Sequence, residues 1–304
     1  MNADLHVDLL GKRLAGPVIA ASGTFGFGAE YADILDLTML GGVSSKGLTL
    51  NGKYGNEGER LYETPSGLII SIGLQNPGVQ HFIDHELPTM KTLGTGVIAN
   101  LGGGCVEDYV TGAAMLEEAG VDYIELNISC PNVKQGGIAY GIKPESAKEV
   151  VSLVRAACPN TRLIVKLSPQ AEDIARMSVA CVEAGADALS LVNTFQACAI
   201  DLRKRKPVFN NIFAGLSGPA VKPIALRMVW QAVGAVDVPV IGLGGISTGE
   251  DALEFIMAGA AAVQVGTASF MDPHACQRVT EEIGAWMDAN GVKNLDEIRG
   301  CARP

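Results

Sequence analysis

Short apolar runs alternate with longer segments of helical period along most of the chain. The apolar runs predict strands at Pro17–Ala21, Gly42–Ser45, Gly96–Leu101, Tyr123–Ile128, Leu163–Leu167, Ala188–Val192, Pro239–Leu243 and Ala262–Val265. The segments between them have helical length and period, as in Val106–Glu118, Glu145–Ala157, Ala171–Glu183 and Lys222–Gly234. Near-continuous apolar strands that alternate with helices form a parallel sheet covered by helices, so the pattern predicts an α/β fold.

The helix-to-strand turns repeat a local pattern that supports this architecture. Glu118-Ala119-Gly120-Val121-Asp122 and Glu183-Ala184-Gly185-Ala186-Asp187 each place Gly after the last helical turn, where a left-handed cap is common. Strand–helix alternation repeated eight times in 304 residues is most simply explained by a (β/α)₈ TIM barrel. The competing architecture is an open doubly wound sheet, but no G-x-G-x-x-G follows the first strand. We therefore expect residues 1–304 to form a single TIM-barrel domain.

Two connections are too long to be simple turns. One runs from about Leu48 to Thr95, after the second predicted strand, and the other from about Phe195 to Lys222, after the sixth. Because both follow strands, we expect both insertions on the C-terminal face of the barrel, where long loops bind or cover ligands. The second insertion carries the basic cluster Arg203-Lys204-Arg205-Lys206, which we interpret as a solvated hairpin tip rather than a docking patch.

Each predicted strand ends in, or is directly followed by, residues that can bind a ligand. These are Ser22-Gly23, Lys46, Asn100, Asn127 with Cys130, Lys166-Leu167-Ser168, Asn193-Thr194, Gly244-Gly245 and Gly266-Thr267. Strand capping alone would place Gly, Asp and Pro at these positions at least as often as Lys and Asn. In a barrel the strand ends converge on one mouth, so the pattern predicts a single large ligand site.

The stretch Asn127-Ile128-Ser129-Cys130-Pro131-Asn132 ends one of these strands with a thiol between two carboxamides. Pro131 removes a backbone donor and ends the strand, which places Cys130 at the rim. Asn127 and Asn132 can each donate and accept hydrogen bonds, as recognition of a flat heterocycle requires. The alternative is a buried structural thiol, since free Cys is among the most buried residue types and this chain has seven.

Gly residues follow the last two predicted strands, at Gly244-Gly245 and Gly266-Thr267. They allow backbone N–H groups to approach a phosphate closely, and the helix predicted to begin near Thr248 would offer its positive end. Lys166, on the fifth strand, could form a Schiff base, bind a phosphate or stand beside the pyrimidine edge of a flavin. It could also simply extend from the strand end to solvent.

A metal site and a hydrolase are both poorly supported. His81 and His85 are four residues apart and would share a helix face, but no third ligand is evident. His6 and His274 lie outside the strand ends, which disfavours a Ser-His-Asp or Cys-His arrangement.

Composition narrows the class of protein further. The net charge of −10 argues against nucleic-acid binding, which needs a basic surface. No apolar run is long enough to span a bilayer, and charged residues interrupt residues 1–16, so we expect a cytoplasmic protein. The nearest cysteines in sequence, Cys181 and Cys198, are too far apart for a C-x-x-C ligand set, so the thiols are expected to be reduced and any iron–sulfur cluster must come from another chain.

Taken together, the motifs closely resemble the FMN-containing catalytic subunits of class 1B dihydroorotate dehydrogenases. The resemblance is carried by Ala21-Ser22-Gly23-Thr24-Phe25-Gly26-Phe27-Gly28, Ile72-Gly73-Leu74-Gln75-Asn76-Pro77-Gly78, Asn127–Lys134, Leu216-Ser217-Gly218-Pro219-Ala220 and Gly242–Ile246. It implies FMN-dependent oxidation of (S)-dihydroorotate to orotate in de novo pyrimidine biosynthesis. The membrane-bound class uses Ser as its base and adds an N-terminal amphipathic extension, for which a first strand near Pro17 leaves no room.

The resemblance also implies site residues. One FMN per chain would contact Ser22, Lys46, Gly47, Asn100, Asn127, Lys166, Val192, Gly218, Gly244, Gly245, Gly266 and Thr267, the last four around its phosphate. The pyrimidine would contact Lys46, Ile70, Ser71, Ile72, Gly73, Leu74, Asn127, Asn132, Asn193 and Thr194. Cys130 would be the catalytic base, which takes a proton while a hydride passes to the flavin.

Class 1B chains of this kind pass electrons to a partner subunit with FAD and a [2Fe–2S] cluster, and from there to NAD, in a heterotetramer of two catalytic and two electron-transfer subunits. The lack of clustered Cys is consistent with that division. One departure is that the family usually has Asn at the position of Ile70, and Ser71 or Asn76 would have to compensate. Alternatives are therefore an FMN oxidoreductase for another dihydropyrimidine such as dihydrouracil, a tRNA dihydrouridine synthase, which the acidic charge opposes, and a non-redox Schiff-base aldolase that uses Lys166.

Overall fold

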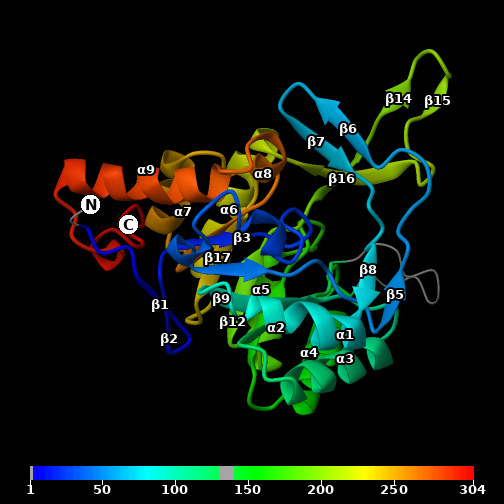
Figure 1. The fold of residues 1–304 in the computed structure, drawn as a ribbon, viewed down its shortest axis with the longest axis horizontal. Helices are drawn as coiled ribbons and strands as arrows, with labels where there is room; N and C mark the ends of the chain where they lie inside the picture. Colours follow the sequence, from blue (N-terminus) through cyan, green and yellow to red (C-terminus); the bar gives the residue numbers. More distant parts are fainter. Residues whose placement is uncertain (1–2, 130–139) are drawn as a thin grey trace.

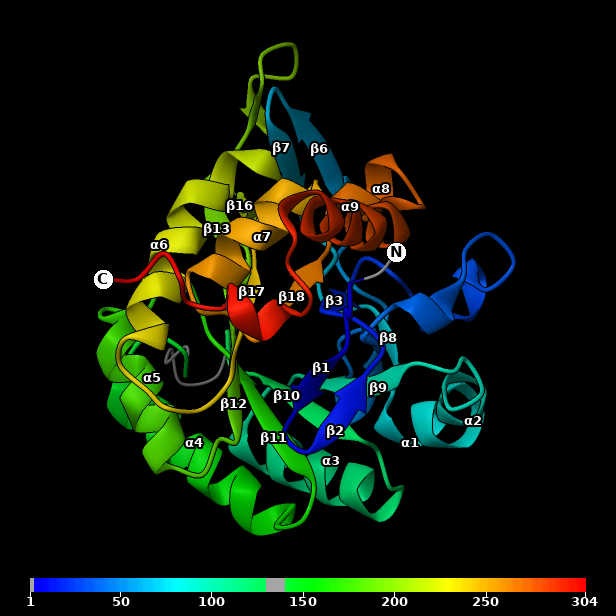
Figure 2. The same cartoon turned by 90° about the vertical axis from the view of Figure 1, so that its left-hand side faces the viewer.

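The computed structural model describes residues 3–129 and 140–304 of the chain. Within these residues, eight parallel strands close into a barrel, with helices around it (Figures 1 and 2). The barrel strands are β3 (Val18–Ala20), β4 (Gly42–Ser44), β9 (Gly96–Leu101), β10 (Tyr123–Asn127), β11 (Arg162–Lys166), β12 (Ala188–Leu191), β17 (Val240–Leu243) and β18 (Ala262–Val265). Each agrees with a predicted strand to within one residue at either end, so the predicted (β/α)₈ barrel is confirmed.

Helices follow most of the barrel strands and cover their outer face (Figure 2). They are α3 (Val106–Glu118), α4 (Pro144–Ala157), α5 (Ile174–Glu183), α6 (Lys222–Val233), α7 (Gly249–Met257), α8 (Ala268–Met271) and α9 (Ala275–Asn290). The bounds of α3 are those predicted. Helix α5 begins later than the predicted Ala171, because the Asp173 carboxylate accepts the N–H groups of Ala175 and Arg176 and so caps the helix at that point.

The amino-terminal end of the barrel is closed by a hairpin of β1 (Val7–Leu9) and β2 (Lys12–Leu14), which lies in front of the barrel strands in Figure 2. Leu9 and Leu14 pack against a layer of inward-facing side chains: Ile19, Ile98, Tyr123, Ile164, Ala188, Ile241 and Ala262. The hydroxyl of buried Tyr123 donates to the Leu9 carbonyl oxygen at 2.9 Å. The lower barrel is thus filled by apolar side chains, and the hairpin is its floor.

Replacing Tyr123 with Phe should test this floor. The change removes one buried hydrogen bond and leaves the Leu9 carbonyl oxygen without its partner, so we expect the free energy of unfolding to fall by about 1–3 kcal/mol. Urea denaturation followed by circular dichroism measures the change. Tyr62→Phe, at an exposed tyrosine of the first insertion, is the control and should change the free energy of unfolding by less than about 0.5 kcal/mol. Equal effects of the two substitutions would contradict a structural role for the Tyr123 hydroxyl.

The two long insertions lie beyond the carboxyl ends of the strands and contain strands that the sequence pattern did not predict. In the first insertion, β5 (Asn51–Lys53) pairs with β8 (Asn76–Gly78). A four-stranded antiparallel sheet in the order β13–β16–β7–β6 joins the two insertions, as Figure 1 shows. Its strands are β6 (Leu61–Thr64), β7 (Gly67–Ile70), β13 (Phe195–Cys198) and β16 (Phe213–Ser217).

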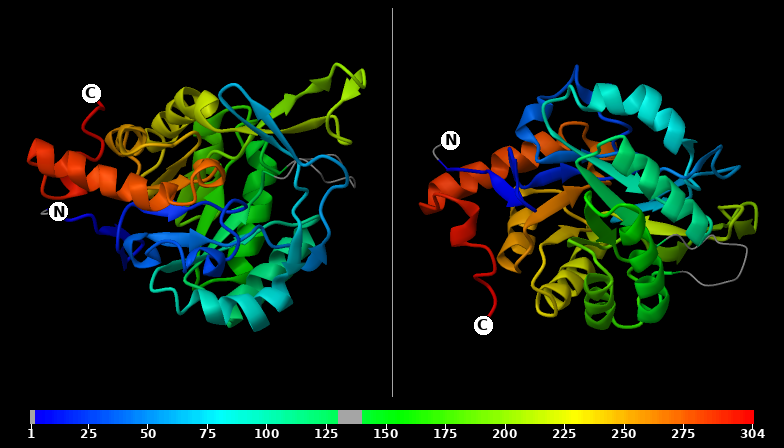
Figure 3. Two further views of the ribbon diagram at one scale, coloured as in Figure 1. Left: turned by 45° about the horizontal axis from the view of Figure 1, so that its top comes forward. Right: turned by 90° about the horizontal axis from the view of Figure 1, so that it is seen from below.

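The basic cluster forms the tip of a projecting hairpin (Figure 3). Strand β14 (Ile200–Asp201) pairs with β15 (Lys206–Pro207), and the turn between them is exposed. The predicted hairpin tip is therefore confirmed.

Between β8 and β9 the chain forms α1 (Val79–His81), a π-helical turn, η3 (Phe82–Glu86), and α2 (Leu87–Met90). The His81 and His85 rings lie beside each other there, with centroids 4.4 Å apart. In the part of the chain that the structure describes, no group of three or more His, Cys, Asp or Glu side chains is placed to hold a metal ion. Likewise, none of the helices formed by the described residues is long and apolar enough to cross a membrane.

Candidate active site

A cavity of about 900 Å³ opens at the carboxyl ends of the barrel strands, between these ends and the inserted sheet. It is lined by all the residues predicted to contact a cofactor: Ser22, Lys46, Gly47, Asn100, Asn127, Lys166, Val192, Gly218, Gly244, Gly245, Gly266 and Thr267. It is also lined by the predicted substrate contacts Lys46, Ile70, Ser71, Ile72, Gly73, Leu74, Asn127, Asn193 and Thr194. Cys130 and Asn132, the predicted base and a further substrate contact, lie outside the described residues.

Below the cavity, one layer of barrel side chains is polar. Such barrels are filled by layers of four side chains from alternate strands, mostly Val, Ile and Leu. Here strands β4, β10, β12 and β18 contribute Ser44, Glu125, Ser190 and Gln264, all buried. Sequence analysis missed this layer, although Glu125 interrupts an apolar run and shares a face of β10 with Asn127, two residues on.

The Glu125 carboxylate is completely buried and fully surrounded by donors. It accepts hydrogen bonds from Ser190 Oγ (2.8 Å), Gln264 Nε2 (2.6 Å), Asn100 Nδ2 (2.6 Å) and Ser44 Oγ (3.2 Å). Its Oε2 atom also lies 3.5 Å from the Nζ atom of Lys166. Burial by itself would raise the pKa of Glu125, but the Lys166 ammonium and the hydrogen bonds outweigh burial and lower this pKa. The group is therefore an ionised carboxylate at the centre of the barrel.

Lys166 connects this buried layer to the cavity. The residue is 4% exposed, lines the cavity and ends strand β11. Its ammonium group donates to Ser22 Oγ at 3.2 Å, across the barrel mouth, in addition to the ion pair with Glu125. The side chain is thus held in the barrel interior and does not extend into bulk solvent, which removes the simplest of the four interpretations of this residue.

Two buried amide oxygens beside Lys166 are unpaired. Asn100 Oδ1 and Gln264 Oε1 have no hydrogen-bond partner within the described residues, because the amide nitrogens of both side chains donate to Glu125. Both residues line the cavity. An unpaired buried acceptor costs about 1–3 kcal/mol, so the site suits a ligand that brings N–H donors. The isoalloxazine ring of a flavin offers an N–H donor together with acceptors for a cation, and this set of groups fits it.

The opposite end of the cavity is built from glycines. Gly218, Gly244 and Gly245 have φ angles of 94°, 127° and 76°, which favour residues without a side chain. A Cβ atom on Gly245 would lie 2.7 Å from the backbone nitrogen of Lys222 and 2.8 Å from the Gly218 carbonyl oxygen. The loops therefore pack directly against each other and present backbone to the cavity, as a phosphate site requires.

The start of helix α7 contributes less to this end than the sequence predicted. The N–H groups of Ser247 and Thr248 donate to the Asp251 carboxylate at 2.9 and 3.0 Å, and that of Gly249 donates to Glu282 at 2.6 Å. A capping box between Thr248 and Asp251 completes the helix start. Because carboxylates of the chain itself already accept these groups, we expect a phosphate to contact the glycine loops rather than α7.

Two carboxamides meet at the side of the cavity near the end of β10. The Asn127 Oδ1 atom accepts hydrogen bonds from Ser129 Oγ at 2.6 Å and from Asn193 Nδ2 at 3.3 Å. Asn193 Nδ2 also contacts Ser129 Oγ, and Asn193 Oδ1 accepts the N–H of Thr194 at 2.7 Å. Tyr109 fixes the backbone here by donating to the Asn127 carbonyl oxygen at 2.9 Å. Ser129, which sequence analysis did not single out, thus orients both amides.

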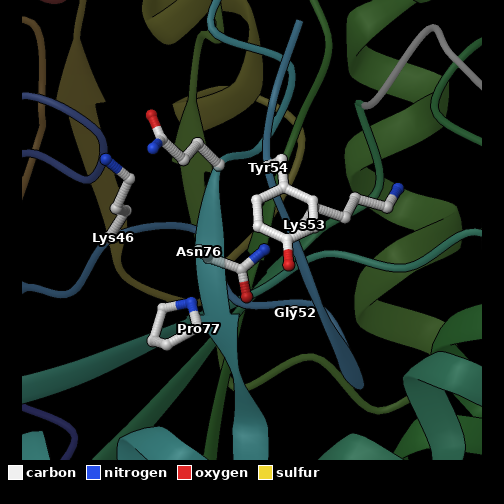
Figure 4. A pocket seen from close by; sticks show the side chains of 7 residues that line it. Lys46, Gly52, Lys53, Tyr54, Asn76 and Pro77 are labelled. Atoms are coloured by element: carbon white, nitrogen blue, oxygen red, sulfur yellow. The ribbon is translucent and has the colours of Figure 1, made fainter.

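The outer part of the cavity forms a hollow of about 510 Å³ between the insertions and the barrel rim. Figure 4 shows Lys46 on one side of it, with Lys53 and Tyr54 on the other and Asn76 between them. The hollow shares Lys46, Lys53 and Tyr54 with the larger cavity, so it is a vestibule of the same site. Within the described residues, no carboxylate pairs with Lys46, which leaves its ammonium group able to bind an anionic ligand.

Comparison with known proteins decides the family. Residues 4–287 match the family model described as "Dihydroorotate dehydrogenase". This chain belongs to the dihydroorotate dehydrogenase family. It is 54% identical over 297 residues to a relative from Petrotoga mobilis (98% of this chain, 99% of the relative) and 53% identical over 299 residues to one from Geotalea uraniireducens (98% of each). A relative from Bacteroides fragilis is 48% identical over 300 residues (98% and 99%). All three are called "Dihydroorotate dehydrogenase B (NAD(+)), catalytic subunit".

The family resemblance implies Asn at the position of Ile70, and the structure limits what could compensate for its absence. Ile70 ends β7 and lines the cavity. The Asn76 amide is already used: its Oδ1 accepts the N–H groups of Thr49 and Gly78, and its Nδ2 donates to Thr49 Oγ1 and the Leu74 carbonyl oxygen. Asn76 is therefore not free to replace the missing family Asn.

Ser71 remains a candidate for that role, together with a residue that sequence analysis did not identify. Asn56, from the connection between β5 and β6, lines the cavity beside Ser71. Its Nδ2 atom donates to the Ser71 carbonyl oxygen at 3.1 Å and to Ser71 Oγ at 3.0 Å. A carboxamide from another segment thus lies beside Ser71, the residue that follows Ile70.

Proposed function

We propose that this chain is the catalytic subunit of an NAD-linked dihydroorotate dehydrogenase, which oxidises (S)-dihydroorotate to orotate in pyrimidine biosynthesis. Relatives with this printed name are about half identical to the chain over almost its full length, and this observation carries the proposal. The barrel-mouth cavity agrees with it, since a buried cation, unpaired acceptors, glycine loops and neutral amides suit a flavin and a pyrimidine.

The cofactor of this proposal is one FMN per chain, held in the cavity. The loops at Gly244, Gly245, Gly266 and Thr267 would hold its phosphate, while Lys166 and Asn100 would contact its ring. When bound, FMN supplies the two-electron acceptor for the hydride that leaves C6 of dihydroorotate. The chain contributes the fixed charge and hydrogen bonds that hold the ring in place.

The residues of the chain would bind the substrate and remove a proton. Asn127 and Asn193 would pair with the N–H and C=O groups of the pyrimidine, and Lys46 with its carboxylate. By the family resemblance, the Cys130 thiolate takes the proton from C5. Loss of that proton and of the C6 hydride leaves the electron pair of the C5–H bond to form the C5=C6 double bond of orotate, so atoms and electrons balance.

The proposal includes a partner subunit. The relatives' name, "catalytic subunit", points to a separate electron-transfer chain, which by the family resemblance carries FAD and a [2Fe–2S] cluster and reduces NAD. We propose a cytoplasmic heterotetramer of two catalytic and two electron-transfer subunits. Copurification from native lysate tests it: a companion protein with flavin and iron–sulfur absorbance is expected, and purification of this chain alone from a gentle lysate would contradict it.

The primary test uses colour and substrate choice. The purified protein should be yellow with FMN, and anaerobic dihydroorotate should bleach it rapidly, whereas dihydrouracil should not. Steady-state turnover with an artificial acceptor gives the same comparison as kcat/KM. Faster turnover of dihydrouracil would favour the alternative, an FMN oxidoreductase for another dihydropyrimidine, which the Ile70 departure motivates.

Ile70→Asn should strengthen dihydroorotate binding. The substitution restores a carboxamide at a position that lines the cavity, and a substrate polar group that is buried without a partner costs about 1–3 kcal/mol. That energy corresponds to a rise in kcat/KM for dihydroorotate of roughly 5- to 150-fold, which we expect mainly through a lower KM. Ile70→Leu is the control, because it keeps an apolar side chain of similar volume. If the Asn variant leaves kcat/KM unchanged or lower, Asn56 and Ser71 already satisfy the substrate.

A further inference from the structure

The mechanism proposed above gives no role to the charge of Glu125. The residue is 0% exposed and lies below the cavity, inside the closed barrel. Its four hydrogen-bond donors and its ion-pair partner come from five different strands: the donors are Ser44 on β4, Asn100 on β9, Ser190 on β12 and Gln264 on β18, and the ion-pair partner is Lys166 on β11. A single carboxylate therefore links most of the barrel at one level.

Stability does not explain this arrangement. Burying a charge is costly unless it is paired, and replacing a buried ion pair with well-packed apolar side chains is often neutral or stabilising. The layer directly below is apolar in this same barrel, with Ile19, Ile98, Ile164 and Ile241 facing inward. An aliphatic residue would thus also be compatible with the barrel at the position of Glu125, one layer above. Glu125 is better explained by its effect on the groups above it.

Those groups are the ones that face the ligand. Lys166, Asn100 and Gln264 all line the cavity, and each uses a nitrogen to contact Glu125. By accepting both amide N–H groups, the carboxylate turns the Asn100 and Gln264 oxygens away from itself and leaves them unpaired. Its negative charge, 3.5 Å from the Lys166 Nζ atom, also offsets part of the field of that ammonium group in the cavity.

We propose that Glu125 is a positioning residue that sets both the hydrogen-bonding pattern and the net charge at the floor of the flavin site. It fixes Asn100 and Gln264 as acceptors, holds Lys166 in the barrel and reduces the effective positive charge that the flavin meets. This inference rests on the proposed FMN site. Its consequence is a lower midpoint potential of bound FMN than Lys166 alone would give, because a cation stabilises the negative charge of reduced flavin.

Glu125→Gln is the direct test, because it removes the charge and nearly keeps the shape. Equilibrium redox titration of the FMN-bound protein against a reference dye should give a more positive midpoint potential. The preference of the site for reduced over oxidised FMN should rise on the order of tenfold, as expected for one uncompensated charge in a partly desolvated site. Ser190→Ala is the matched control: it removes one neutral donor to the same carboxylate, keeps both charges and should shift the potential much less. An unchanged or more negative potential in Glu125→Gln would overturn the proposal.

A second pair of variants covers the case in which Glu125→Gln does not fold. Lys166→Met leaves the carboxylate buried without its cation, whereas Lys166→Met with Glu125→Gln removes both charges. If the two residues act as a pair, the double variant should retain more FMN through gel filtration than Lys166→Met alone. Equal or lower retention in the double variant would refute the pairing.

These readouts are independent of the substrate. If dihydroorotate fails to bleach wild-type protein that holds FMN, the proposed substrate is wrong. The shift in the midpoint potential of FMN can still be measured in that case. Conversely, the wild-type protein could bleach normally while Glu125→Gln and Ser190→Ala show the same midpoint potential of FMN. That result would refute only the proposed role of Glu125.

Discussion

Cys130→Ala should leave the protein yellow and abolish its rapid reduction by dihydroorotate. The proposed FMN contacts that line the cavity include no thiol, so the flavin should bind normally. Without a base to take the C5 proton, the carbon–hydrogen bond at C6 has no developing double bond to assist its cleavage. General bases contribute about 10²–10⁴-fold, and we expect a loss of at least this size in the bleaching rate. Anaerobic stopped-flow absorbance of the flavin measures it directly.

The control for this prediction is another cysteine. Cys105 is exposed at the start of helix α3 and does not line the cavity, so Cys105→Ala should bleach at the wild-type rate. Rapid bleaching of the Cys130→Ala protein would rule out the thiol as the base and make Ser129 the next candidate, because it contacts the Asn127 and Asn193 amides.

Lys166→Ala should cost the protein both flavin and stability. The ammonium group lies 3.5 Å from the buried Glu125 carboxylate, and removing one partner of a buried pair leaves an uncompensated charge, which typically costs about 3–5 kcal/mol. The cavity would also lose its deepest cation. We therefore expect low FMN occupancy after purification, measured by the ratio of flavin to protein absorbance, and a lower midpoint of urea denaturation.

Lys148→Ala is the matched control, because the Lys148–Glu183 pair has a contact of 2.7 Å but lies on the surface. Exposed pairs contribute about 0–1 kcal/mol, so this variant should keep its flavin and nearly all its stability. Normal flavin occupancy in Lys166→Ala would contradict a contact between Lys166 and FMN.

The barrel could be predicted from sequence because its strands are local signals. Each is a short, nearly continuous apolar run buried on both faces. Helix α3 likewise begins and ends where the helical spacing of its apolar residues begins and ends. Strands β7 and β16 were missed because their stability comes from pairing across a long stretch of chain, as between Ile70 and Gly215. No periodic pattern within either insertion specifies that partner.

The candidate site divides in the same way. The strand-end residues could be identified because all barrel strands end at the same mouth, which fixes their convergence without knowledge of side-chain contacts. Asn56 could not, since its place beside Ser71 depends on how the first insertion folds. Glu125 could have been found from the sequence, because it is an acidic residue within an apolar strand. A charged side chain in a buried apolar environment is unfavourable, and such exceptions are expected at functional sites.

The inserted sheet joins parts of the mouth that lie far apart in sequence. Strand β7 ends at Ile70, which lines the cavity, and its neighbour β16 runs directly into Gly218, beside the glycine loops. Strand β13, on the other side of β16, follows Asn193 and Thr194. Because these strands are hydrogen-bonded to one another, a displacement of one of them would also shift the cavity-lining residues that adjoin the others.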